Sequence, residues 1–194
     1  MAQAKVRKKF FDVDMPILKK ETQLIGFSIE DLNGRFIIYD LTRLLRGKNS
    51  TLQLKVEFEE GKPVAKPREL KVLSYFIKKM MRKGTNYVED SFSGQCKDAQ
   101  LKIKPFLITR RKVSRSIRKA LREKAKEEIL AYISDKSYDI VFQDLLKNQL
   151  QKTLSLRLKK IYPLSLCEIR TIKVEKILEE KAEKKPSSKE KSED

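Results

Sequence analysis

The segment from Arg110 to Leu121 constrains this chain most, because a strand pattern runs into it and an amphipathic helix pattern runs out of it. Six of its twelve residues are Arg or Lys. Like charges held this close repel one another, and a folded domain keeps such a cluster most naturally against a polyanion. The segment therefore predicts a mixed α and β domain that binds nucleic acid.

The positive charge belongs to the body of the chain. Lys and Arg number 45 against 27 Asp and Glu, for a net charge of +18. Residues 178–194 hold five Lys and six acidic residues, so they add nothing to this excess. Nucleic acid, an anionic membrane and an acidic protein are the partner classes of such a charge. No apolar run approaches the ~20 residues that span a bilayer, and no signal-peptide pattern follows the basic start, so we expect no membrane partner.

Residues that carry common catalytic chemistry are missing. The chain of 194 residues contains no histidine, which removes histidine triads, histidine acid–base catalysis and histidine metal sites. No glycine-rich dinucleotide-binding pattern occurs. Cys96 and Cys167 lie far apart without metal-ligand spacing, so we interpret them as reduced, half-buried thiols. We expect no enzyme activity, no cofactor and no metal.

Alternation of apolar and polar residues predicts an antiparallel sheet. The clearest strand runs from Leu52 to Phe58, with every second residue apolar. A basic arm over residues 5–14 leads into a first strand, and residues 15–34 are expected to be loop with short strand pieces. Pro105 indicates an edge strand or a bulge, because proline cannot donate to a ladder. Further strands are expected over 35–40, 87–92, 99–109 and 166–174, with a turn at 93–95.

Helix patterns complete the expected fold. Residues 67–83 show apolar residues at spacings of three and four, with Pro67 suited to the first position and Gly84 to the stop. Ser114 can cap a helix over 115–133. Two more helices are expected over 137–148 and 150–161. The sequence predicts an α+β class with an antiparallel, partly closed β-barrel-like sheet and packed helices. We expect one domain over 1–177 and a disordered charged tail over 178–194.

The basic residues form candidate RNA contacts. Arg111, Arg115, Arg118 and Arg122 align at spacings of four, three and four, opposite an apolar face. Arginine suits this role because its planar fork binds two phosphate oxygens and stays charged. A second basic stripe is expected on the helix over 67–83. The candidate set comprises Arg7, Lys8, Lys9, Lys71, Lys78, Arg82, Arg110, Arg111, Lys112, Arg115, Arg118, Lys119, Arg122, Lys159 and Lys160.

The motifs and aromatic residues of the chain indicate which type of nucleic acid these cations bind. No helix-turn-helix, zinc-finger or basic-zipper pattern is present, and no strand carries an RNA-stacking aromatic motif. Aromatic residues make up 8% of the chain and Trp is absent, so base stacking is not indicated. This pattern favours folded RNA recognised by its shape. An RNA-processing or RNA-modifying enzyme and an architectural DNA-binding protein remain the alternatives.

Several segments resemble one ribosomal-protein family. The run from Ile161 to Leu164, followed by Glu168 to Val174, resembles the C-terminal signature of a small-subunit ribosomal protein family of archaea and eukaryotes. That family is called "S three a" in the older naming and "e-S-one" in the newer. Phe10 to Val13, Gly34-Arg35 and the stretch from Arg110 to Lys119 agree in the same order. The resemblance covers about residues 8–176; the loops around 62–66 and 97–99 depart from the family.

The resemblance implies a non-enzymatic component of the small ribosomal subunit, with a β-barrel-like core and helices. It implies small-subunit rRNA and neighbouring platform ribosomal proteins as partners, with mRNA near the exit. It also implies a location in the cytoplasmic ribosome. The chain lacks the long C-terminal extension of eukaryotic members, so it resembles the archaeal branch more.

Overall fold

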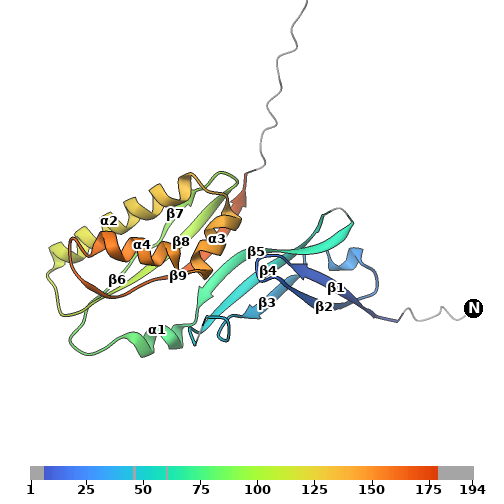
Figure 1. The fold of residues 1–194 in the computed structure, drawn as a ribbon, viewed down its shortest axis with the longest axis horizontal. Helices are drawn as coiled ribbons and strands as arrows, with labels where there is room; N and C mark the ends of the chain where they lie inside the picture. The colour runs from blue at the N-terminus through green and yellow to red at the C-terminus, as the bar shows by residue number, and fades with distance from the viewer. Residues whose placement is uncertain (1–6, 46, 60, 179–194) are drawn as a thin grey trace, which may run out of the picture.

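The computed structural model describes residues 7–45, 47–59 and 61–178 and shows a mixed α and β fold (Figure 1). Within these residues, nine strands form one sheet. Every strand pair is antiparallel except β1 and β5, which meet in parallel at Asp14 and Val64. The strands are β1 (Lys9–Met15), β2 (Lys20–Gly26), β3 (Phe36–Asp40), β4 (Ser50–Glu59), β5 (Lys62–Val72), β6 (Tyr87–Glu89), β7 (Phe92–Gln95), β8 (Ala99–Thr109) and β9 (Leu164–Ile177). The α+β class with a largely antiparallel sheet is confirmed.

Strand β5 joins the two halves of the sheet. Along one edge it pairs with β4 over its whole length, and along the other it meets β1 near its start and β9 near its end. One half of the molecule therefore contains β1 to β5, and the other contains β6 to β9 with the larger helices (Figure 1). The helices are α1 (Ser74–Met80), α2 (Arg115–Ser134), α3 (Tyr138–Leu146) and α4 (Gln149–Leu158), with a 3-10 turn at Glu30–Leu32.

Strand β8 carries cores on both of its faces. Leu101, Ile103 and Leu107 belong to the main core, which includes the buried stripe of α2 at Leu121, Ala125, Ile129 and Ile133. The intervening Phe106 and Ile108 pack with Val72 and Ile77 in a second, smaller core beneath α1. This alternation follows from the two-residue period of a strand. It fixes α1 on the face of β8 that lies opposite α2.

Strand β7 approaches α2 closely at Gly94. A Cβ atom on this glycine would lie 2.5 Å from Ile133 Cδ1 and 2.6 Å from Leu130 Cδ2. Any larger residue would push the helix side chains away, so glycine permits this helix-to-sheet distance.

The backbone ladder does not close into a barrel. Strand β2 stands at one end of the strand order, and β3 pairs with β4 alone. Side-chain hydrogen bonds bridge the edge formed by β2 and the one formed by β3: Lys20 Nζ donates to the Tyr39 hydroxyl at 2.9 Å, and Arg35 NH1 donates to the Ile25 carbonyl at 2.8 Å. The sheet is therefore open. The mixed α+β fold is confirmed, whereas the expected partial closure into a barrel is only partly supported.

The helix expected over 67–83 is wrong in its first half. Strand β5 continues to Val72, and a helix forms only from Ser74 to Met80. The physical reason is a bulge: Leu54 pairs with Pro67 and Gln53 with Glu69, so Arg68 is the extra residue. The bulge shifts the buried positions of the strand by one residue, and apolar spacing across it imitates a helix.

Smaller differences concern the strands on either side. Residues 93–95, expected as a turn, belong to β7, which pairs with β8, and residues 20–26 form a full strand. Pro105 lies at a register shift between β8 and β9, so the bulge is confirmed. Strand β8 is not an edge strand, because it pairs on both sides, but Pro105 itself lies between the residues that pair with β7 and those that pair with β6.

The C-terminal strand is longer than expected and ends at Ile177. The Leu178 amide then donates to the Asp98 carbonyl at 2.7 Å. The disordered tail expected over 178–194 otherwise lies outside the described residues, and the domain boundary at 177 stays a prediction. Ser114 caps α2 as expected, with its hydroxyl accepting from the Ile117 amide at 3.4 Å.

Candidate nucleic-acid interface

Three basic segments meet around Thr109, the last residue of β8. Thr109 pairs with Leu164 at the start of β9, and its amide donates to the Asn86 carbonyl at 2.9 Å. The chain after α1, the link from β8 into α2 and the link from α4 into β9 therefore converge at one end of the molecule (Figure 1). Eight exposed cations lie on these segments: Arg82, Lys83, Arg110, Arg111, Lys112, Arg115, Lys159 and Lys160. We call this set the basic end.

Part-buried hydrogen bonds hold the central basic link in place. The Thr109 hydroxyl is fully buried and lies 2.7 Å from the Arg111 carbonyl, to which it donates. The same hydroxyl accepts from the Asn86 amide at 3.0 Å. The Asn86 side-chain oxygen in turn accepts from the Val113 amide at 2.8 Å. The backbone between β8 and α2 is thus anchored on both sides, so its guanidinium groups project from a fixed frame.

The basic end keeps its charge free of internal partners. In the part of the chain that the structure describes, none of its eight cations forms an ion pair. Cations elsewhere do: Lys102 pairs with Glu175 at 3.3 Å and Lys124 with Glu127 at 2.7 Å. Uncompensated like charges on a rigid frame favour binding of a polyanion.

The arginine stripe expected on α2 is only partly formed. Arg111 precedes the helix, which begins at Arg115, so the two do not share a helical face. Arg118 is half-buried on the packing side, and its Nε is buried without a hydrogen-bond partner among the described residues. Arg122 is exposed further along α2, and Lys119 pairs with Glu123 at 3.7 Å. The β8–α2 link, rather than one helix face, therefore carries the dense charge.

Other candidate residues lie away from the basic end. Arg7, Lys8 and Lys9 precede or begin β1 at the opposite end of the molecule (Figure 1), where Lys8 lies 5.4 Å from the Phe27 ring. Lys71 is exposed on β5, and Lys78 is exposed on α1. The basic stripe expected to join them does not exist, because the helix there is short. Lys83 belongs to the basic end but was not among the predicted residues, although it directly follows Arg82 in sequence.

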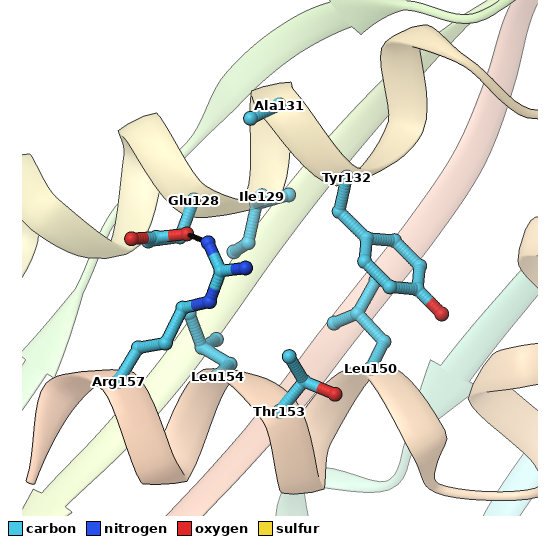
Figure 2. A pocket seen from close by; sticks show the side chains of 8 residues that line it. All are labelled: Glu128, Ile129, Ala131, Tyr132, Leu150, Thr153, Leu154 and Arg157. Atoms are coloured by element: carbon cyan, nitrogen blue, oxygen red, sulfur yellow. Dashed lines mark hydrogen bonds and ion pairs between the residues drawn. The ribbon is translucent and has the colours of Figure 1, made fainter.

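A pocket between α2 and α4 contains no catalytic arrangement (Figure 2). Its eight lining residues include one acid and one base, Glu128 and Arg157, which form an ion pair with each other. Tyr132 and Thr153 add hydroxyl groups, and the rest of the lining is apolar. Because the Glu128 carboxylate is already paired with Arg157, we interpret this pocket as a packing gap between two helices.

The cysteines are free thiols: Cys167 is half-buried as expected, whereas Cys96 is buried. No group of three or more Cys, Asp or Glu side chains in residues 7–45, 47–59 and 61–178 is arranged to hold a metal ion. Burial, helped by the charge of Glu168, raises the pKa of Cys167 to about 12, so this thiol stays protonated. Among the described helices, none has the length and apolarity that a bilayer crossing requires.

A protein-family comparison decides the family. The model of the Ribosomal S3Ae family matches residues 3–177, which is nearly the whole described fold. The chain belongs to the Ribosomal S3Ae family. Membership makes it a cytoplasmic ribosomal protein that takes part in translation, and it is not an enzyme. The resemblance found in the sequence is confirmed.

Two archaeal relatives agree with this membership. The chain is 28% identical over 99 residues to a protein of Methanothermobacter thermautotrophicus named small ribosomal subunit protein eS1. That match covers 50% of this chain and 51% of the relative, about half of its length. A protein of the same name from Nanoarchaeum equitans is 27% identical over 167 residues, covering 81% of this chain and 83% of the relative.

Proposed function

We propose that this S3Ae family member is a structural constituent of the small ribosomal subunit and binds small-subunit rRNA through its basic end. The observation that carries the proposal is a set of eight exposed cations on three converging segments, with no internal ion pair in the described structure. The names of the archaeal relatives support the small subunit as the site of assembly. Phosphate oxygens of folded RNA are the partners that such a surface fits.

The family resemblance supports the finer part of the proposal. We propose a position on the platform near the mRNA exit, beside neighbouring platform proteins and with mRNA as a further contact, which is what the resemblance implies. The basic arm at Arg7, Lys8 and Lys9 lies at the opposite end of the molecule from the basic end. We propose that this arm touches a second rRNA segment, so that the chain bridges two parts of the subunit.

A charge-matched pair of variants tests the basic end. Replacing Arg110, Arg111 and Arg115 with Ala removes three unpaired charges. We expect weaker binding to small-subunit rRNA and a salt slope that is shallower by about 2 to 3, because each phosphate contact contributes ~0.7–0.9. The measurement is fluorescence anisotropy of labelled rRNA over a range of salt concentrations. Retained affinity and an unchanged slope would refute the assignment.

The control removes three cations that already have partners. Lys66, Lys102 and Lys124 each pair with a carboxylate of the same chain. Replacing all three with Ala changes the net charge equally, and we expect a smaller loss of rRNA binding. Duplex DNA is the competitor: stronger binding to it than to rRNA would favour the architectural DNA-binding alternative.

A further inference from the structure

An exposed tyrosine ring lies beside the basic end. Tyr87 begins β6, and 56% of its surface is exposed. Its ring stacks on Phe106, with centroids 6.0 Å apart and an angle of 24° between the planes. Phe106 is buried in the small core beneath α1. One side of the Tyr87 ring is therefore supported by the core while much of the residue stays open to solvent.

The position of this ring relative to the basic end is fixed by strand pairing. Tyr87 pairs with Ile108 across β6 and β8, and the preceding Asn86 is bonded to Thr109. Arg110 follows Ile108 by two residues, just beyond the end of β8, so their Cα atoms are at most about 7 Å apart. That distance is similar to the reach of one nucleotide. A bound RNA strand can thus place a phosphate on Arg110 and a base on Tyr87.

The charges around the ring are largely compensated. Glu89, two residues along β6, pairs with Arg170 at 3.3 Å. The adjacent shallow hollow is lined by Lys104 together with Glu89, Asp90, Ser91, Pro105 and Arg170. The hollow therefore holds two cations and two acids, and it lies along β6 in the direction away from the basic end.

We propose that Tyr87 stacks on an unpaired base of the RNA whose phosphates are bound by the basic end. The inference rests on the proposed function and deepens it, because it adds recognition of an unpaired nucleotide to recognition of phosphates. A ring with a rigid backing is suited to stacking, since little side-chain freedom is lost on binding. Tyr75 on α1 provides a comparison, because it is exposed and stacks on no aromatic ring among the described residues.

The absence of Trp from the chain gives a direct test. The full-length variant Tyr87→Trp carries a single Trp, and it is mixed with an RNA hairpin that contains one bulged adenosine or with the same hairpin fully paired. We expect the bulged hairpin to quench Trp emission and the paired hairpin to quench it less. Tyr75→Trp, with 62% of Tyr75 exposed, is the control and should not distinguish the two RNAs.

A second variant measures the stacking in affinity. We expect Tyr87→Leu to weaken binding to the bulged hairpin by roughly 5- to 100-fold while leaving the paired hairpin within a factor of about two. Equal quenching by both hairpins, or equal affinity losses, would overturn the stacking proposal. Its failure is distinct from failure of the proposed function, because the variant lacking Arg110, Arg111 and Arg115 tests phosphate binding independently of Tyr87.

Discussion

At the scale of single residues, Thr109 organises the basic end. Its hydroxyl donates to the Arg111 carbonyl and accepts from the Asn86 amide, and it is fully buried. A buried backbone group that loses its partner costs free energy, so this hydroxyl stabilises the link between β8 and α2. The sequence indicated the neighbouring arginines but not this threonine, because its partner Asn86 lies 23 residues away.

We expect Thr109→Val to lower the free energy of unfolding by about 1–3 kcal/mol, because valine has the same shape but leaves buried polar groups unpaired. Urea denaturation followed by circular dichroism provides the measurement. The control is Thr153→Val, whose exposed hydroxyl lies on α4, and it should change stability by less than ~0.5 kcal/mol. Equal effects of the two substitutions would show that the buried network does not stabilise the link.

At the scale of elements, α2 and α3 are joined by a carboxylate. Asp144 on α3 accepts from the Tyr132 hydroxyl at 2.7 Å and from Lys136 Nζ at 2.5 Å. Burial alone would raise the pKa of Asp144, but these hydrogen bonds outweigh it and the pKa is lowered from 3.8. The folded carboxylate then keeps its charge to lower pH than the unfolded one. Its contribution to stability is present above about pH 4 and is lost as the pH falls through the folded pKa.

We expect Asp144→Asn to lower the free energy of unfolding at pH 7 by about 1–3 kcal/mol. The difference from the unmodified protein should shrink as the pH falls below about 4, because both proteins then lack the carboxylate charge. Urea titrations at neutral and acidic pH measure this, with Asp12→Asn on the exposed face of β1 as control. A difference that stays constant with pH would contradict the role of the Asp144 charge.

At the scale of the whole molecule, the half built from β1 to β5 is an open sheet whose edges meet through side chains. Lys20 reaches the Tyr39 hydroxyl, and Arg35 reaches the Ile25 carbonyl. The other half is held by the long pairing of β8 with β9 and by the helices that cover it (Figure 1). Strands with a backbone partner on one side only open more easily, so β2 and β3 are expected to be the least protected part of this half of the sheet.

We expect Arg35→Met to speed hydrogen exchange of amides in β2 by roughly 2- to 10-fold. The reason is that the hydrogen bond from Arg35 to the Ile25 carbonyl of β2, which contributes about 0.5–1.5 kcal/mol, is lost. Methionine retains the apolar stem, and the amides of β8 and β9 should be unchanged. Hydrogen exchange with residue resolution measures this. The control is Arg43→Met, at an exposed position that does not contact β2 through a hydrogen bond. Faster exchange throughout the sheet would contradict the prediction that Arg35 protects β2 locally.

The sequence by itself determined the class of fold, the helices from α2 to α4, most of the strands and the family. These features depend on local spacing and capping: the stripe from Leu121 to Ile133 and the Ser114 cap are visible within one or two helical turns. The density of charge at Arg110 to Lys112 is equally local. These residues form the middle of the basic end, and their binding to RNA stays a prediction.

Only the tertiary structure decided which cations lie together. Bulges such as that at Arg68 depend on the opposing strand, so the spacing of β5 alone suggested a helix. Lys159 and Arg82 join the arginines because β9 and the chain after α1 flank Thr109, whereas the arm at Lys8 lies elsewhere. Such neighbours are set by strand pairing between distant segments, and no local pattern contains that information.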